Sequence, residues 1–352
     1  MKKILTLMVA AVVMMGSLGA CAQKAETPAQ DTQKLSIVTT IFPPFDFART
    51  IGGEKAEVSM LLPPGAESHS FEPSPQDIIK VQEADLFIYN GGDSDAWVDE
   101  ILESMGENAP ATLKMMDAVN LLEEEVVEGM EHDEHDHDHD HDHDADKDKK
   151  DDHDHDADKN KEEDHDHDHE GTHTHEGVMD EHVWTSPKNA IKISQAIAEK
   201  LAGTDPENAT FYMDNFKAYK EKLTALDTQF KEIVEHATLK TMVFGDRFPL
   251  RYFANEYGLD YYAAFVGCST QSDASAATVA FLIDKVKEEK IPTVFFIELS
   301  EHKIADAVSE ATGSQIAMFH TCHNVTKAEL EEGATYLSLM EKNAETLKAA
   351  LQ

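Results

Sequence analysis

The sequence predicts an α/β protein with two parallel-sheet lobes joined by a long, rigid helix. Residues 35–122 and 240–326 each alternate apolar runs of strand length with amphipathic stretches of helix length, the pattern of repeated β-loop-α units. Residues 188–236 keep helical spacing and contain almost no glycine and a single proline, Pro206. We therefore place the first lobe at 35–187, the linking helical segment at 188–239 and the second lobe at 240–352.

The first lobe is expected to hold three strands, each ended by prolines or glycines. The strands fall at 34–40, 56–62 and 85–89, with helices after them at 45–53, from Pro75 onward and at 96–105. Parallel sheets bind ligands in the loops beyond the carboxyl ends of their strands. The loop after the second strand contains His69, which makes that loop a candidate site.

The second lobe repeats the pattern after the helical span. Strands are expected at 241–244, 260–266, 292–299 and 315–319, with helices at 249–257, 275–287 and 302–312 and a helical tail from Lys327. The span before it reads as two helices, or as one helix interrupted near 203–206.

An acidic, histidine-rich tract interrupts the first lobe. Residues 123–181 carry 28 acidic and 5 basic side chains, so this part holds −23 of the formal charge of −39, and strong acidity argues against nucleic acid as a partner. A tract this polar cannot bury a core, so we expect a disordered His/Asp-rich loop at about 123–180. Imidazole is the usual ligand of late first-row divalent metals, so we interpret the loop as an auxiliary metal-gathering segment rather than an acidic spacer. Its histidines are His132, His135, His137, His139, His141, His143, His153, His155, His165, His167, His169, His173 and His175.

The N-terminus has the pattern of an export signal. Lys2 and Lys3 precede an apolar run at 4–15 that is too short to span a bilayer. Residues 18–21, Leu-Gly-Ala-Cys, resemble a bacterial lipoprotein signal, so we expect a signal peptide at 1–20, lipidation of Cys21 and a polar tether at 21–34. The alternative is ordinary cleavage that leaves Cys21 as a free thiol. The lipoprotein interpretation predicts an exported protein anchored by lipid to the outer face of the bacterial cytoplasmic membrane.

Several side chains at expected strand ends could meet between the lobes and bind a metal. Two or three imidazoles with a carboxylate form a site that suits Zn²⁺ and tolerates Mn²⁺. His323 competes with His320 for a place in this site, and Glu298 competes with Asp246. The set we predict is His69, His182, Asp246 and His320.

The sequence lacks the common motifs of enzymes. It contains no GxSxG, no HExxH, no P-loop and no GxGxxG after a strand. A zinc hydrolase would need an open coordination position beside a general base, an arrangement that spacing alone does not exclude. We therefore expect a binding protein rather than an enzyme.

Three segments together resemble the solute-binding lipoproteins of zinc/manganese ABC importers. They are PPGAESHSFEPSPQDI at 63–78, the His/Asp-rich insertion before EHVWTSP at 181–187, and FGDRFPLRYFANEYGLDYY at 244–262. The resemblance covers essentially the whole mature chain. It implies two α/β lobes bridged by a rigid helix, metal held in the cleft between the lobes, an ABC importer permease as partner and a monomer. The histidine-rich loop is typical of the zinc-importing branch.

The resemblance also implies ligand positions, two of which depart from the family pattern. His69 matches the ligand of the PPG…H motif, and His182 matches the ligand of the HVW motif. The third family ligand is usually a histidine at the start of the segment 246–253, where this chain has Asp246 and no histidine. The fourth is commonly acidic and follows the last strand, where this chain has His320. The exchange would preserve a mixed histidine and carboxylate set in swapped positions.

Cys268 and Cys322 are the two cysteines beyond the N-terminal segment. In an exported protein such a pair is most simply a disulfide, and the alternatives are two free thiols or thiolate metal ligands. Some zinc-type members of the family carry a second-lobe disulfide, and Cys268 with Cys322 resembles it.

The function these features favour is capture of Zn²⁺ outside the membrane for an ABC importer, with the loop gathering or buffering metal. The rival is a surface zinc-storage lipoprotein or metal-dependent adhesin without a transport role. A zinc hydrolase is the third interpretation. Deleting 131–176 would distinguish the first two, because only the importer interpretation predicts that the main site survives.

Overall fold

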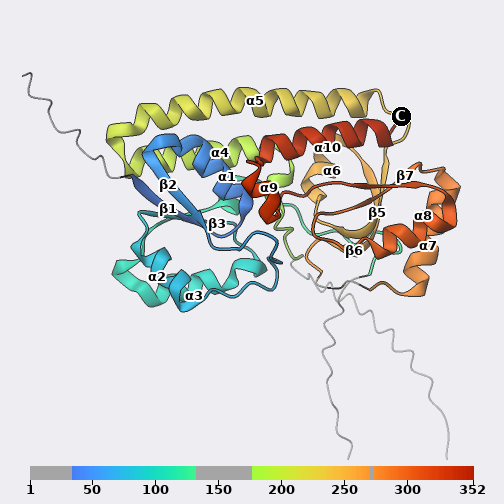
Figure 1. Cartoon of the computed structure of the whole chain (residues 1–352), viewed down its shortest axis with the longest axis horizontal. Helices are drawn as coiled ribbons and strands as arrows, with labels where there is room; N and C mark the ends of the chain where they lie inside the picture. Colours follow the sequence, from blue (N-terminus) through green and yellow to red (C-terminus); the bar gives the residue numbers. More distant parts are fainter. Residues whose placement is uncertain (1–33, 132–176, 270, 272) are drawn as a thin grey trace, which may run out of the picture. The chain divides into compact units, whose positions relative to one another are not determined.

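Two four-stranded parallel sheets form the framework, which confirms the predicted fold class (Figure 1). The structure is a computed structural model that describes residues 34–131, 177–269, 271 and 273–352. The first sheet has the order β2-β1-β3-β4, and the second has the order β6-β5-β7-β8. Their strands are β1 Leu35–Thr39, β2 Ala56–Met60, β3 Leu86–Tyr89, β4 Ala111–Lys114, β5 Thr241–Phe248, β6 Asp260–Val266, β7 Thr293–Phe296 and β8 Gln315–Met318.

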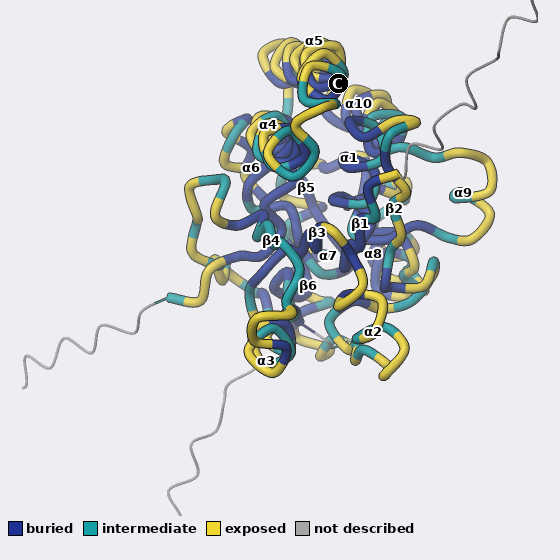
Figure 2. Tube along the Cα trace, turned by 90° about the vertical axis from the view of Figure 1, so that its left-hand side faces the viewer, coloured by how far each residue is buried: buried dark blue, intermediate teal, exposed yellow. Residues whose placement is uncertain are grey.

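Helices cover both faces of the first sheet. One face packs against α1 (Phe42–Gly52) and α4 (Pro187–Thr204), and the other packs against α2 (Pro75–Glu83) and α3 (Ala96–Met105). α1 begins before the expected break, because Pro43 and Pro44 occupy its first turn, where the missing N–H costs nothing. Figure 2 shows the central strands β1 and β3 largely buried, the edge strands β2 and β4 only partly buried, and much of α2 and α3 exposed.

The second sheet is covered in the same way. α7 (Ala276–Glu289) and α8 (Lys303–Thr312) pack on one face, while α6 (Arg251–Tyr257) and α10 (Tyr336–Ala350) belong to the core on the other. A short helix, α9 (Lys327–Glu331), precedes α10. The strand β5 is longer than its apolar run suggested and continues through Gly245 to Phe248. Gly245 does not end the strand; a side chain there would lie 2.4 Å from the backbone nitrogen of Ala305 in α8.

The helical span between the lobes forms two packed helices. α4 ends at Thr204, and α5 (Ala209–Glu235) is a 27-residue helix, about 40 Å long at 1.5 Å per residue. α5 runs past both sheets in Figure 1. Its buried residues and those of α1, α4, α6 and α10 form one continuous apolar cluster, so the same core is shared by both lobes.

The margins of the acidic tract are ordered, contrary to the expected loop boundaries. Glu123 forms an antiparallel bridge with Met179, and Glu131 forms a parallel bridge with Phe265 of β6. The Glu131 carboxylate also accepts hydrogen bonds from Ser275 N and Thr278 Oγ1, both 2.6 Å long. These contacts tie 123–131 and 177–180 to the folded body, which composition alone did not reveal.

Several predictions fall outside the described residues. They are the signal peptide, Cys21, the tether up to residue 33 and all thirteen tract histidines. Among the helices that the structure describes, none combines the length and the hydrophobicity needed to cross a bilayer.

Candidate metal centre

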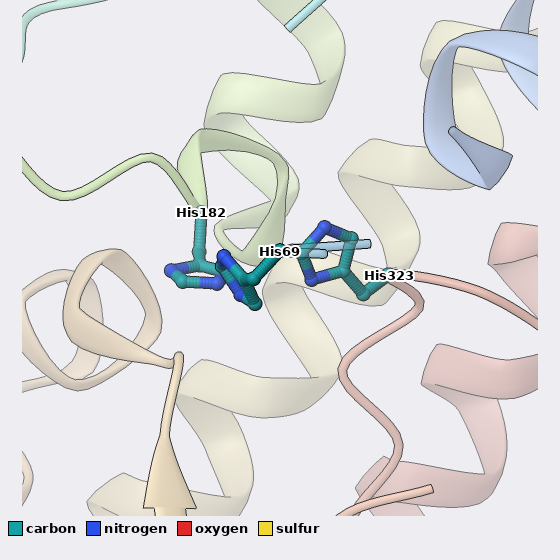
Figure 3. A group of neighbouring side chains, drawn as sticks. All are labelled: His69, His182 and His323. Atoms are coloured by element: carbon teal, nitrogen blue, oxygen red, sulfur yellow. The ribbon is translucent and has the colours of Figure 1, made fainter. Parts of the chain in front are cut away.

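Three histidines from distant parts of the chain meet in one small pocket (Figure 3). His69 lies in the loop after β2, His182 immediately precedes the short 3-10 helix Val183–Thr185 before α4, and His323 follows β8. The ring centroid of His69 lies 5.6 Å from that of His182 and 5.1 Å from that of His323, and the centroids of His182 and His323 are 5.3 Å apart. One ligand nitrogen of each lies within 4.8 Å of the others. A cation could therefore contact all three imidazoles after a small closing movement.

Each imidazole is positioned by a hydrogen bond through one ring nitrogen. His182 Nδ1 lies 3.3 Å from Asp180 Oδ1, and His69 Nδ1 lies 2.8 Å from Ser94 Oγ. His323 Nδ1 lies 3.4 Å from Ser68 Oγ. Such contacts fix the ring and leave the second nitrogen for a metal.

The free nitrogen of His182 supplies the strongest sign that the pocket takes a ligand. The residue is completely buried, and its Nε2 has no hydrogen-bond partner. An unpaired polar atom in that position costs stability, so buried polar groups are nearly always satisfied. A metal ion would satisfy it.

The electrostatics keep two of the imidazoles neutral. Burial, followed by the nearby His182, lowers the pKa of His69 to about 3. Burial likewise holds the pKa of His323 well below its usual range. Burial is the largest influence on the pKa of His182 and acts to lower it, but the carboxylates of Asp180, Glu181 and Glu124 together outweigh it and the net shift is upward. Neutral imidazoles have the free lone pair that a metal requires.

The loop that carries His323 is held by Glu298 and Trp184. The Glu298 carboxylate accepts hydrogen bonds from the backbone N–H of Thr321 (2.7 Å) and of His323 (3.2 Å). The Trp184 indole N–H donates to Thr321 O at 2.8 Å, and its ring lies 4.9 Å from that of His323. Glu298 lines the pocket, but its carboxylate is committed to positioning the backbone of this loop.

An ion pair between the lobes borders the pocket. Arg247 Nη2, from β5, lies 3.0 Å from Glu67 Oε2, in the loop that carries His69. Arg247 also donates through Nη1 to Ser269 O at 3.1 Å. Both charged residues line the same cavity of about 30 Å³, which has room for an ion.

Asp246 does not join this group, contrary to the prediction. It lies within β5 and not beyond its end, where its carboxylate accepts hydrogen bonds from Arg247 N (2.8 Å) and Ile297 N (3.4 Å). It lines the neighbouring, larger cavity of about 610 Å³, which shares Glu67 and Arg247 with the histidine pocket. The strand continues because its bulge at 244–247 restores pairing with β6.

His320 also lies outside the group. Its Nδ1 accepts a hydrogen bond from Cys322 N at 2.9 Å, and its backbone is bonded on both sides to the Asn343 amide of α10. These contacts direct the ring toward Glu298 and Glu329, each 3.7 Å away. His323, which we ranked below His320, occupies the pocket instead.

The predicted disulfide is absent, because Cys268 and Cys322 are both free. Cys268 follows β6 and Cys322 follows β8, and these strands are the two outer edges of the second sheet. Three strand spacings of about 4.8 Å separate those edges, whereas a disulfide needs Cα atoms within roughly 7 Å. The side chain of Cys322 is buried in the main core.

Sequence reasoning missed the residues that support the histidines. Ser68, Ser94 and Asp180 carried no motif, although Asp180 stands two residues before His182 and Ser68 directly precedes His69. That closeness along the chain was the only available signal for two of them.

A family model described as zinc-uptake complex component A, periplasmic, matches residues 37–350. The zinc-binding lipoprotein AdcA of Streptococcus pneumoniae serotype 4 is 31% identical over 315 residues, which are 90% of this chain and 55% of the relative. The chain thus spans about half the length of that relative. The high-affinity zinc uptake system protein ZnuA of Bacillus subtilis is 31% identical over 336 residues, 95% of this chain and 93% of the relative.

Solved structures agree with the fold. The Zn(II)-bound ZnuA-like domain of Streptococcus pneumoniae AdcA has a TM-score of 0.68 at 28% identity and covers 91% of this chain and 99% of its own. The metal-dependent lipoprotein YcdH of Bacillus subtilis has a TM-score of 0.69 at 28% identity, covering 91% of this chain and 100% of its own.

Proposed function

The chain belongs to the family of periplasmic zinc-uptake complex components, and from this membership we propose that it captures Zn²⁺ outside the cytoplasm for an ABC importer. The observation that carries the proposal is the buried, unpartnered Nε2 of His182 facing two further imidazoles. The cargo would be held by His69, His182 and His323.

The ligand set favours zinc over manganese. Three imidazole nitrogens suit Zn²⁺, whereas Mn²⁺ prefers carboxylate, carbonyl and water oxygens. Zinc-binding relatives and a Zn(II)-bound structure of similar fold support the same choice. The family role in uptake also agrees with the prediction that the chain is not an enzyme.

Cargo release requires that the site can open, and its construction allows this. His69 belongs to the first lobe, His323 belongs to the second, and His182 lies at the junction with α4. A small separation of the lobes would break one or two metal bonds without unfolding either sheet. The permease would induce that separation when it accepts the ion.

The proposed location is the outer face of the cytoplasmic membrane. Cys21 would carry the lipid, as the Leu-Gly-Ala-Cys sequence predicts, and the lipoprotein name of the pneumococcal relative supports an anchor. The thirteen histidines between His132 and His175 would raise the local metal concentration near the pocket.

The test is calorimetric titration with zinc and with manganese on two proteins, the mature chain and the chain lacking 132–176. Glu131 is kept because its carboxylate binds the second lobe. His69→Ala in the shortened chain is the site variant, and His236→Ala, an exposed histidine on a helix end, is its matched control. One tight zinc site that survives the deletion, is lost in His69→Ala and remains in His236→Ala supports the proposal. Loss of all tight binding on deletion would instead support the zinc-storage alternative.

A further inference from the structure

A second group of metal-ligating side chains borders the three histidines. One ligand atom each of His69, Glu181 and Cys268 lies within 4.8 Å of the other two. The group shares His69 with the histidine set and adds a thiol and a carboxylate. Glu181 stands next to His182 in sequence, and Cys268 follows β6.

Glu181 is held in this place by the surrounding backbone. Its side chain is almost fully buried, and its Oε1 accepts a hydrogen bond from Ser94 N at 2.9 Å. Gly92 has a positive φ of 82°, and a Cβ there would lie 2.4 Å from Oε1 of Glu181. The close approach of the backbone therefore fixes the position of this carboxylate.

No lysine or arginine among the described residues forms an ion pair with Glu181, and its buried neighbour Asp180 is paired with the His182 ring of the first ligand set. Glu124 adds a third carboxylate, whose Oε1 accepts from Cys268 N at 3.3 Å. Buried carboxylates are normally paired or bound to a metal. Negative charge concentrated around a free thiol attracts a divalent cation.

We propose that His69, Glu181 and Cys268 form a second ligand set, which binds Zn²⁺ or another thiophilic divalent cation in alternation with the three-histidine set. The inference deepens the proposed function, on which it rests, because the same pocket must receive the metal. The chemistry is one of ligand exchange. The Cys268 S–H bond breaks, a metal–sulfur bond forms and the proton leaves to the solvent.

The two sets differ in what they offer an ion. Thiolate sulfur binds Zn²⁺ at about 2.3 Å, imidazole nitrogen at about 2.0–2.1 Å and carboxylate oxygen at about 2.0–2.2 Å, so a mixed set is compatible with zinc. Since one imidazole of His69 serves both sets, only one is complete at a time. An ion could move from one set to the other by keeping His69 and exchanging the remaining ligands.

The experiment uses Co²⁺ as a spectroscopic probe of the full chain, carrying Cys21→Ser so that the only thiols are Cys268 and Cys322. Cobalt bound by thiolate shows a sulfur-to-metal charge-transfer band in the near ultraviolet, which imidazole and carboxylate do not produce. We expect this band in the protein and a stronger band in His323→Ala, where the histidine set is incomplete. Cys268→Ser should abolish it.

Cys322→Ser is the matched control and should keep the band, because Cys322 is completely buried and belongs to neither ligand set. A second measurement, alkylation of the His323→Ala chain followed by mass spectrometry, avoids changing Cys268. Zinc should abolish modification of Cys268.

The outcomes separate this inference from the proposed function. Absence of the band in both the Cys21→Ser protein and its His323→Ala variant would overturn the inference. The proposed function is judged separately, by the zinc titrations of the chain lacking 132–176, in which the tract histidines do not contribute. Persistence of the band in Cys268→Ser would also overturn it. If His323→Ala binds the metal as tightly as the parent protein and all tight binding shows the thiolate band, the histidine set is refuted and the second set is kept.

Discussion

The choice between His323 and His320 gives the sharpest test of the pocket. The two residues stand three positions apart in one loop. His320 is buried, His323 is half-buried, and their rings point in different directions. Replacing each with alanine separates a metal ligand from a structural histidine at matched position and size. We expect His323→Ala to weaken zinc binding and His320→Ala to leave it nearly unchanged.

The expected magnitudes follow from the contacts of each ring. A structural zinc site contributes roughly 10–16 kcal/mol over four ligands, so one ligand contributes about 2.5–4 kcal/mol, or about two to three powers of ten in Kd. His320 contributes a hydrogen bond from Cys322 N to its Nδ1. Its loss leaves a buried N–H unpaired and should lower the free energy of unfolding by about 1–3 kcal/mol.

The assay is competition between the protein lacking 132–176 and a chromophoric zinc chelator. Trp184 supplies a second readout, because its ring lies 4.9 Å from His323 and 5.5 Å from His182. Urea unfolding of both metal-free variants measures the stability change. An equal loss of zinc affinity in the two variants would refute the assignment of the rings.

Three further predictions address charge and positioning. Lowering the pH from about 6.5 toward 3 should destabilise the metal-free protein, with a slope approaching about 1.4 kcal/mol per pH unit for one histidine. The reason is that this histidine binds a proton in the unfolded chain, whereas folded His69, with its pKa of about 3, stays neutral. Urea unfolding of the protein and of His69→Gln at several pH values would measure the slopes, and equal slopes would contradict the prediction. Arg247→Gln removes a cation from the pocket and leaves the Glu67 carboxylate unpaired, so zinc affinity should rise by about tenfold. Zinc release should slow in a stopped-flow chelator experiment, and weaker binding would count against repulsion of the metal by Arg247. Glu298→Gln replaces an acceptor of two backbone N–H groups in the loop of His323 and should weaken zinc binding by about 10–100-fold in the same chelator assay; unchanged affinity would show that this carboxylate does not position the loop.

The fold class was predictable because its signals are local. The apolar runs that became β1, β3 and β6 are bounded by turn residues, and the 27-residue α5 keeps helical spacing throughout. Strand β4 was not identified, since Ala111–Lys114 is short and only half-buried. Strand order could not be inferred from such signals. The disulfide prediction was wrong because the strand order places Cys268 and Cys322 at opposite edges of the second sheet.

The histidines His69 and His182 were identified from the sequence because their surrounding motifs are distinctive and both lie beside expected strand ends or turns. Asp246 was misplaced for a definite reason. Gly245 looked like a strand end, but it is required by the close approach of α8, which is a tertiary contact. The strand therefore continues, and the carboxylate accepts a hydrogen bond from Ile297 N instead of lying with the three histidines.

The sequence by itself determined the α/β lobes, the helical link, the acidic histidine-rich tract and two of the three converging imidazoles. Only the tertiary structure decided that His323 and not His320 completes the group, and that Cys268 stands free beside it. The physical reason is that periodicity records which residues are buried along one element. Which buried side chains face one another depends on strand order, on bulges and on hydrogen bonds such as those of Asn343 to His320, and these join residues far apart in the chain.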